Sequence, residues 1–400
     1  HLMRHLYLAA TGQNRGKTTA SLGLLDLFLG AGLRTGFMKP VGQRTVVDDT
    51  GVPADEDAVL VKAVYALPEA MTAMSPVHIP RGFTKAYIAG QVVEDLGAKI
   101  SAAHATFVDE KDVLLIEGTG HAGVGAVVGL SNAVVAARLG APAIIVSEGG
   151  VGRPIDEIVL NASHFAAHGV HVAGAIVNKV DVDAQPGIAT ILERGLARHG
   201  IPLLGVLPYR PILSNPSLAM IVEGLRGEVV WPGPDLDLVI GQVAIGAMEP
   251  HHVLERIGPE TLVIVPGDRE DVLLTLATAH LMGRARGATA AEAAGLGGQA
   301  DPPAVRLVNL TVNGSRPAGA ALGLVLTDGY RPRPAVIDAI GRADLFAILV
   351  SEDTYTVASA VHDLLVKTHA SDRDKIALIK ALVAEHLDVG RILEVSRPVA

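Results

Sequence analysis

The sequence predicts an α/β protein of two domains, the first with a mostly parallel sheet and the second smaller. Three observations support this prediction. From Arg4 to about Arg226, short apolar or β-branched segments alternate with longer amphipathic or small-residue segments, which is typical of a parallel sheet. A run of turn-forming residues then interrupts the alternation. A second alternating pattern follows that interruption.

Composition is consistent with two domains and excludes several classes of partner. The chain has 400 residues, which is longer than the chains that usually fold around one hydrophobic core. No apolar run reaches the roughly 18 to 20 residues that cross a bilayer, so we expect no membrane partner. The formal net charge is -9 with acids and bases interspersed, so we expect no nucleic-acid partner. The chain has no cysteine and no basic-then-apolar leader, which predicts a cytoplasmic protein.

The strands expected in the first domain are short apolar segments, at residues 5–10, 35–39, 113–117, 143–146, 172–177 and 203–207. Segments that suit helices lie between them, at residues 18–29, 90–106 and 155–168. In a parallel sheet of this kind, functional loops gather at the carboxyl ends of the strands. We therefore look for chemistry where each expected strand ends.

The expected domain boundary lies at residues 228–234, where Trp231-Pro232-Gly233-Pro234 cannot continue a helix or an inner strand. We assign residues 3–228 to the first domain and 235–400 to the second. The second domain has expected strands at 261–265, 323–327 and 346–350 and helices near 271–282 and 355–365. Residues 283–303 are rich in Ala and Gly and predict a flexible insertion, and 372–395 predict a closing helical region.

A candidate phosphate-binding loop joins the first expected strand to the first expected helix. Backbone N–H groups of such a loop can surround phosphates, while Lys17 can neutralise their charge and the Thr18 hydroxyl can ligate magnesium. The competing interpretation is an ordinary helix capped after a polar turn. The candidate nucleotide-binding residues are Thr11, Gly12, Gln13, Asn14, Arg15, Gly16, Lys17, Thr18 and Thr19.

Three charged residues stand where further expected strands or helices end or begin. Lys39 ends the second strand and could contact the γ-phosphate or a carboxylate substrate, although a solvated lysine is the simpler interpretation. Asp57 opens a helix, where an acid also stabilises the helix dipole. Glu117 ends a strand beside the loop, and a carboxylate there suits magnesium binding.

Asn178-Lys179-Val180-Asp181 follows another expected strand. An asparagine at such a strand end can recognise a purine edge by paired hydrogen bonds. The tetrapeptide also has the Asn-Lys-x-Asp form by which GTPases recognise guanine, and a plain turn is a further alternative.

Together these motifs resemble the dethiobiotin synthetase family of P-loop enzymes, over about the first half of the chain. The resemblance implies a P-loop NTPase fold with ATP and Mg²⁺ as cofactors. It implies that Lys17 and Thr18 bind phosphates and magnesium, that Asp57 and Glu117 complete the metal site, and that Asn178 recognises adenine. Lys17 and Lys39 would be catalytic, with Lys39 assisting carbamate chemistry. The motifs, in family order, are the loop, Lys39-Pro40-Val41, Asp57-Ala58, Glu117-Gly118-Thr119-Gly120, Asn178-Lys179-Val180 and Gly205-Val206-Leu207-Pro208.

The second half resembles the DRTGG domain, through the turn Pro266-Gly267-Asp268-Arg269-Glu270-Asp271 and the strand ends Leu326-Thr327-Asp328-Gly329 and Asp353-Thr354. The pairing is similar to the N-terminal regulatory half of long bacterial phosphotransacetylases. This chain ends where their acetyltransferase domain would begin, so we expect no acetyl transfer by this polypeptide alone. The first half departs from the dethiobiotin synthetase pattern at Ala10, Gln43 and His121-Ala122.

Three functions follow as hypotheses. The preferred one is a nucleotide-responsive regulator that binds MgATP, with a second small ligand on the DRTGG domain. The alternative is an ATP-dependent carbon-nitrogen ligase that activates a carboxylate or carbamate and takes a small carboxylate or amine substrate. The third is a GTP-binding protein. By analogy with related enzymes we expect a homo-oligomer.

Overall fold

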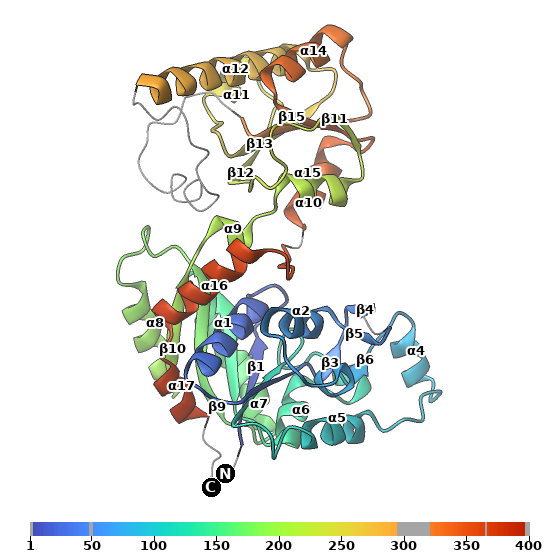
Figure 1. Cartoon of the computed structure of the whole chain (residues 1–400), viewed down its shortest axis with the longest axis vertical. Coiled ribbons are helices and arrows are strands. Elements are labelled where there is room, and N and C mark those ends of the chain that lie inside the picture. The colour runs from blue at the N-terminus through green and yellow to red at the C-terminus, as the bar shows by residue number, and fades with distance from the viewer. Residues whose placement is uncertain (1–2, 48–50, 294–320, 365, 397–400) are drawn as a thin grey trace. The chain divides into compact units, whose positions relative to one another are not determined.

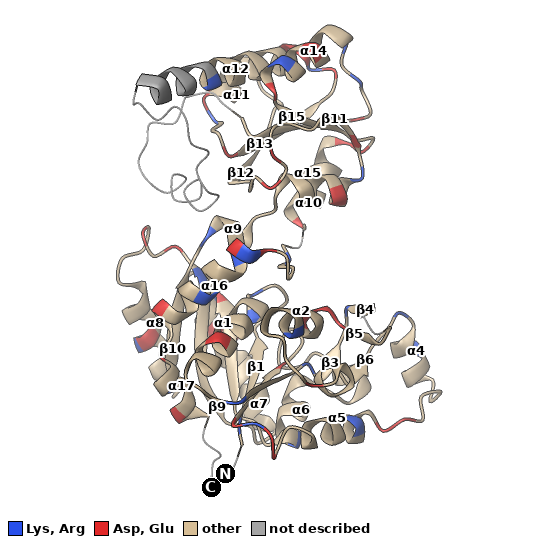
Figure 2. Ribbon diagram, viewed as in Figure 1, with Lys and Arg blue, Asp and Glu red and all other residues tan. Residues whose placement is uncertain are grey.

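A computed structural model describes residues 3–47, 51–293, 321–364 and 366–396. The chain forms two compact units, one of His1–Arg210 with Thr368–Ala400 and one of Pro211–Lys367 (Figure 1). These limits differ from the expected domains 3–228 and 235–400, because the last part of the chain returns to the first unit. Among the described helices, none is both long enough and apolar enough to cross a membrane. Lys and Arg residues alternate with Asp and Glu residues along the described ribbon of each unit (Figure 2).

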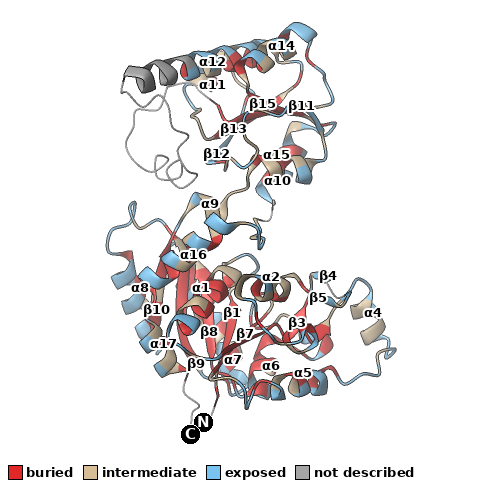
Figure 3. Cartoon of the chain, in the orientation of Figure 1, coloured by how far each residue is buried: buried red, intermediate tan, exposed pale blue. Residues whose placement is uncertain are grey.

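The first unit is built on a six-stranded sheet in which every neighbouring pair is parallel. The strands are buried, as Figure 3 shows for the centre of this unit, because their apolar runs have helices on both sides. Each expected strand of the first domain is present. In sheet order the strands are β10 (Leu203–Pro208), β9 (Val172–Val180), β8 (Ala143–Glu148), β1 (Arg4–Ala10), β7 (Val113–Glu117) and β2 (Thr35–Met38).

Helices connect these strands, and one of them begins later than expected. The helix expected at 90–106 begins only at Leu96, as α5 (Leu96–Ala105), and the helix before it, α4 (Phe83–Ile88), ends before Gly90. The cause is local, since the Asp95 carboxylate accepts a hydrogen bond from Ala98 N and caps α5. The other helices are α1 (Lys17–Gly30), α2 (Glu56–Tyr65), α3 (Met71–Met74), α6 (Asn132–Leu139), α7 (Gly152–Ala167), α8 (Ile188–Ala197) and the 3-10 turn η1 (Ala126–Val128).

Two small sheets lie beside the helical connections of the first unit. One pairs β3 (Val41–Gly42) with β6 (Val77–His78) in parallel, and the other pairs β4 (Thr45–Val47) with β5 (Pro53–Asp55) in antiparallel orientation. The closing helices α16 (Arg373–His386) and α17 (Val389–Val395) also belong to this unit, and both contact α1.

The second unit contains a five-stranded sheet, parallel except at one edge. The expected boundary at 228–234 differs from the observed one, because the second unit begins at Pro211 and residues 228–231 form its edge strand β11, antiparallel to β15. An edge strand needs a partner on one side alone, so the prolines that follow it are tolerated. In order the strands are β11 (Glu228–Trp231), β15 (Phe346–Leu349), β14 (Gly323–Thr327), β13 (Thr261–Pro266) and β12 (Gln242–Ile245).

Helices cover both faces of this sheet and bury two apolar clusters. On one face lie α11 (Pro250–Leu254), α12 (Glu270–Ala293) and α14 (Pro334–Ala343), and on the other lie α10 (Leu218–Leu225) and α15 (Thr354–His362). A short helix, α9 (Pro211–Ser214), opens the unit. The expected insertion at 283–303 is corrected in its first part, since α12 continues to Ala293, as its alanines favour. Residues 294–303 lie outside the described residues.

Candidate functional site

The loop between β1 and α1 presents unpaired backbone donors. Gly16 adopts φ 98° and precedes the first helical residue, Lys17. The first backbone hydrogen bond of the helix runs from Ala20 N to Gly16 O, at 2.9 Å. Within the described chain, the N–H groups from Gly16 to Thr19 donate to no protein acceptor. A helix start of this kind attracts an anion through its free N–H groups and its dipole.

Lys17 places a buried cation at the same helix start. The residue is 9% exposed, and among the described residues no carboxylate lies within ion-pair distance of its ammonium. Burial lowers the pKa of Lys17 to about 8, and repulsion from Lys39 acts in the same direction. Attraction to a bound anion would offset both effects, so the residues present fit a phosphate group.

Lys39 lies at the centre of a buried ionic cluster. Its Nζ donates to Asp57 Oδ2 at 2.7 Å, to Glu117 Oε1 at 2.8 Å and to the Gly118 carbonyl at 3.3 Å. Burial opposes its charge, yet the neighbouring carboxylates, Glu117 first, raise the pKa of Lys39 well above its usual range. The structure thus brings together a lysine and two acids that are far apart in the sequence.

Hydroxyl groups on α1 connect this cluster to the phosphate loop. Thr18 Oγ1 donates to Asp57 Oδ1 at 3.1 Å, and Ser21 Oγ donates to Glu117 Oε2 at 2.5 Å. Burial raises the pKa of Glu117 to about 7, against the opposing attraction of Lys39. Burial acts the same way on Asp57, but Lys39 and the hydrogen bonds to the carboxylate prevail and hold the pKa of Asp57 at about 2.

The oxygen donors of Thr18, Asp57 and Glu117 are of the type that Mg²⁺ prefers. They lie beside the phosphate loop, where a nucleotide-bound magnesium would need them. Over the described residues, no group of three or more His, Asp or Glu side chains is arranged to hold a metal by itself. The donor set therefore fits a magnesium ion that takes most of its ligands from phosphates and water.

Asn178 and Lys179 support the phosphate loop from the end of β9. Asn178 Nδ2 donates to Arg15 O at 3.2 Å, and Lys179 Nζ donates to Asn14 O at 2.9 Å. A Cβ atom on Gly16 would lie 1.9 Å from Asn178 Nδ2, so a glycine is required there. Asp181, the last residue of the Asn-Lys-x-Asp motif, accepts from Ala184 N at 3.0 Å in an exposed turn.

Glu148, which ends β8, was not identified from the sequence. Its side chain neutralises the positive charges of Arg15 and Lys179. Its carboxylate pairs with Arg15, and its Oε2 lies 2.8 Å from Lys179 Nζ. Beside it, the hydroxyl oxygens of Thr11 and Ser147 are 3.1 Å apart. A carboxylate at the end of a central strand is the signal that could have identified Glu148.

Asn132 on α6 was also missed, and it shapes the loop that follows Glu117. Its Oδ1 accepts from Tyr7 Oη at 2.8 Å and from Thr119 N at 3.0 Å. Its Nδ2 donates to the carbonyls of Thr119 at 2.7 Å and His121 at 2.6 Å. All its hydrogen-bonding groups are satisfied, which holds the loop in one conformation.

In the second unit, the signature-like turn after β13 is a compact structural feature. Arg269 pairs with Asp271 and donates to the Met248 carbonyl at 3.1 Å. A Cβ on Gly267 would lie 1.7 Å from the Tyr330 carbonyl oxygen. At the end of β14, the buried Thr327 hydroxyl lies 2.8 Å from that of Thr354. Within the turn Arg269 and Asp271 therefore neutralise each other, while Glu270 pairs with Arg333.

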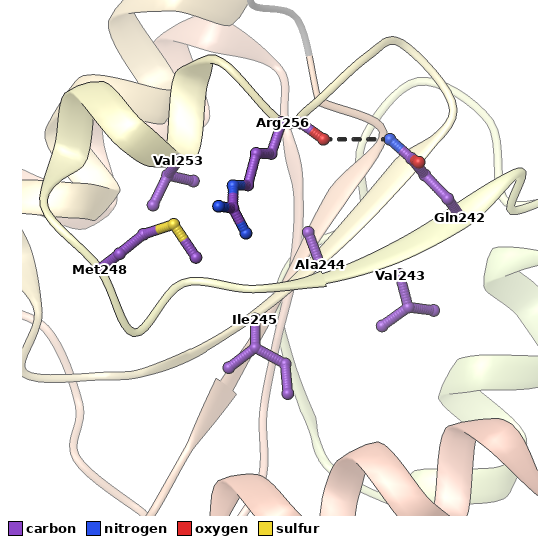
Figure 4. A pocket seen from close by; sticks show the side chains of 7 residues that line it. All are labelled: Gln242, Val243, Ala244, Ile245, Met248, Val253 and Arg256. Atoms are coloured by element: carbon purple, nitrogen blue, oxygen red, sulfur yellow. Dashed lines mark hydrogen bonds between the residues drawn. The ribbon is translucent and has the colours of Figure 1, made fainter.

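A cavity of about 330 Å³ lies elsewhere in the second unit, along the edge strand β12 (Figure 4). The Gln242 side chain donates to the Arg256 carbonyl at 3.2 Å at one end of it. The lining combines apolar side chains with one amide and one guanidinium group, and it includes none of the candidate site residues. It consists of Gln242, Val243, Ala244, Ile245, Met248, Val253 and Arg256.

The parallel sheet, with a Gly-Lys-Thr loop between its central strand and α1, defines a P-loop NTPase fold. The family comparison agrees: residues 4–217 match the AAA domain family, so the chain belongs to that family. Residues 220–364 match the DRTGG domain. Residues 365–400 lie outside both matches.

Curated relatives that match nearly the whole of this chain are named phosphate acetyltransferases. The chain is 28% identical to that of Pseudomonas putida, over 96% of this chain and 51% of the relative. It is 24% identical to that of Synechocystis sp., over 97% of this chain and 51% of the relative. The chain therefore spans about half the length of the curated relatives it matches.

Solved structures with local similarity cover single parts of the chain. The septum site-determining protein MinD of Pyrococcus horikoshii, complexed with Mg-ADP, is 18% identical with a TM-score of 0.34, over 53% of this chain and 84% of that one. The CBS and DRTGG domains of the Clostridium perfringens pyrophosphatase, complexed with diadenosine tetraphosphate, are 17% identical with a TM-score of 0.26, over 37% of this chain and 47% of that one.

Proposed function

We propose that the first unit binds MgATP and that the chain is a nucleotide-responsive regulatory region of the phosphate acetyltransferase type. The observation that carries the proposal is Lys17, a buried ammonium with no carboxylate within ion-pair distance among the described residues. The free N–H groups from Gly16 to Thr19 surround the same position. A triphosphate would neutralise the lysine and accept hydrogen bonds from these groups.

Magnesium would complete this site. Thr18, Asp57 and Glu117 would hold the ion directly or through water, and the ion would neutralise charge on the β- and γ-phosphates. The relatives' names support the phosphate acetyltransferase part of the proposal, since the chain matches about half the length of each relative. In this proposal the DRTGG unit transmits nucleotide occupancy or binds a second small ligand.

A thermal-shift titration tests nucleotide binding. ATP with Mg²⁺ should raise the melting temperature, and Lys17→Ala should abolish the increase. Lys85→Ala is the matched control, because Lys85 is an exposed lysine on α4. An unchanged ATP response in Lys17→Ala would contradict the assignment of the phosphate site.

A second candidate is an ATP-dependent ligase, favoured by the ionic cluster around Lys39. A substrate carboxylate oxygen would attack the γ-phosphorus, and the bond to the β–γ bridging oxygen would break to release ADP. An amine would then displace phosphate to form an amide. Lys17 and Lys39 would stabilise negative charge on the transferred group. Absence of phosphate release with 7,8-diaminopelargonate and bicarbonate, and with a panel of small carboxylates and amines, would count against this candidate.

The oligomeric state is part of the same proposal. Related enzymes build sites across subunit interfaces, so we propose a homo-oligomer by analogy. Size-exclusion chromatography with light scattering measures the mass directly. A monomer at micromolar concentration, with and without MgATP, would contradict it.

A further inference from the structure

The closing segment of the chain completes the nucleotide-binding unit. After β10 the chain builds the second unit and then returns, so residues from Thr368 onward belong to the first unit. This segment lies outside both family matches. Its helix α16 packs directly on α1, the helix that begins with Lys17 and Thr18 (Figure 1).

The contact between α16 and α1 leaves no room for a side chain at Gly23. A Cβ atom on Gly23 of α1 would lie 2.3 Å from Val383 Cβ. On β10, a Cβ on Gly205 would lie 2.2 Å from Leu387 Cδ2. At both positions the absent side chain makes room for this segment. Gly23 and Gly205 therefore allow the closing segment to approach α1 and β10 closely.

Polar contacts also hold the closing segment against the first unit. Lys380 Nζ lies 2.8 Å from Asp26 Oδ1 on α1, and 4.7 Å from the ring centre of Tyr65 on α2. The Tyr65 hydroxyl in turn donates to the Leu22 carbonyl of α1. Arg4 Nη1, at the start of β1, donates to the Leu393 carbonyl of α17 at 3.4 Å. The segment is therefore tied to α1, α2 and β1.

The burial of α1 is consistent with two partners. Its buried residues include both Leu24 and Leu25, together with Leu22 and Phe28. A helix that is apolar on several sides needs cover on more than one face. The central sheet supplies one partner, and the stripe of Ile376, Ile379, Leu382 and Val383 on α16 supplies another.

We propose that α16 is a positioning element for the phosphate site, with Gly23 and Val383 as the positioning residues. By packing on α1, α16 determines where Lys17 and Thr18 lie. In the chain, α16 follows the second unit. The proposal rests on nucleotide binding as the function of the first unit.

A double-substitution cycle tests the proposal. Gly23→Ala adds a methyl group against Val383 and should weaken ATP binding about tenfold. Val383→Ala in the same molecule makes room for that methyl and should restore most of the affinity. Gly30→Ala is the matched control, because it lies on the same helix with no atom within 4 Å of the added Cβ. Its ATP affinity should equal that of the wild type.

Unchanged ATP affinity in Gly23→Ala, or a double variant no better than Gly23→Ala, would overturn the proposal. If Gly23→Ala does not fold, hydrogen exchange of the unmodified protein decides: ATP should slow exchange in residues 373–386, and no change there would also overturn it. If the unmodified protein binds no ATP, the proposed function fails by itself. The packing is then judged from melting temperatures, which Gly23→Ala should lower and the added Val383→Ala should recover.

Discussion

Lys39 and Glu117 form an ion pair, with 2.8 Å between Nζ and Oε1, and their side chains are 5% and 0% exposed. Asp57 shares the same ammonium at 2.7 Å. Removing one partner of a buried pair leaves the other charge without compensation, which is far more costly than the pair itself. Lys39 is therefore a structural counter-ion of this site before any ligand arrives.

Lys39→Met should lower the free energy of unfolding by about 3–5 kcal/mol, because two carboxylates lose their cation. Urea denaturation at pH 7 measures the change. Adding Glu117→Gln should reduce the loss, since a neutral amide replaces the buried charge. A loss in the single variant below about 1 kcal/mol, the size of an exposed pair, would contradict this role.

Gly16→Ala should disrupt the phosphate loop. The residue has φ 98°, and the new Cβ would meet the Asn178 amide. Left-handed backbone costs an alanine roughly 1–2 kcal/mol, and the contact adds to that strain. We expect loss of ATP binding by calorimetry. Gly140→Ala, with φ 62° and nothing within 4 Å, should share the backbone cost and retain ATP affinity; equal ATP affinity in both variants would contradict the prediction.

Asp181→Ala distinguishes adenine from guanine recognition. In the structure this carboxylate accepts one hydrogen bond in an exposed turn, so its loss should hardly affect folding. If the protein binds ATP as proposed, the variant should keep its ATP affinity. If Asp181 reads guanine, GTP affinity should fall about tenfold or more, as for other lost hydrogen bonds to charged groups. Stabilisation of the unmodified protein by GTP and not by ATP would overturn the ATP proposal.

His104 should make the protein less stable in acid. Burial lowers the pKa of His104 to about 4, and its neighbour His5 adds to the effect. Their ring centres are 5.5 Å apart. The folded state therefore resists protonation that the unfolded state accepts near pH 6.5. Neutral His104 therefore leaves the folded state at full stability above pH 6.5, and the free energy of unfolding decreases as the pH falls towards 4.

Melting temperature as a function of pH measures this effect. His104→Gln should flatten the curve between pH 6.5 and 4 relative to the unmodified protein, because one titrating group is removed. His199→Gln changes an exposed histidine and should leave the slope as it is. Identical slopes in the two variants would contradict the assignment.

Much of the first unit could be predicted because its signals are local. Most strands of the sheet have their own run of β-branched or leucine residues, and parallel pairing places the ends of the strands at one edge. That reasoning located Lys39, Glu117 and Asn178. It did not reveal that Lys39 contacts Asp57 and Glu117, since contacts between distant side chains leave no periodic pattern.

The features that the sequence did not predict also depend on contacts between distant parts of the chain or lack a local pattern. The strands β11 and β12 have four residues each and lie at the edges of their sheet, so neither has the continuous apolar run of an inner strand. The helix α16 was recognised as helical, but its partner is Gly23, some 360 residues earlier in the chain. Amphipathic periodicity shows that a helix needs cover and does not say which surface supplies it.

The return of α16 to α1 also affects how the protein is made. During synthesis, the outer face of α1 stays uncovered until the ribosome has completed the second unit and residues 373–386. Emerging chains with exposed apolar faces aggregate readily. A fragment cut at residue 217, where the family match ends, would keep that face open permanently. Expression of the first unit alone should therefore require the closing helices, joined to β10 by a short linker.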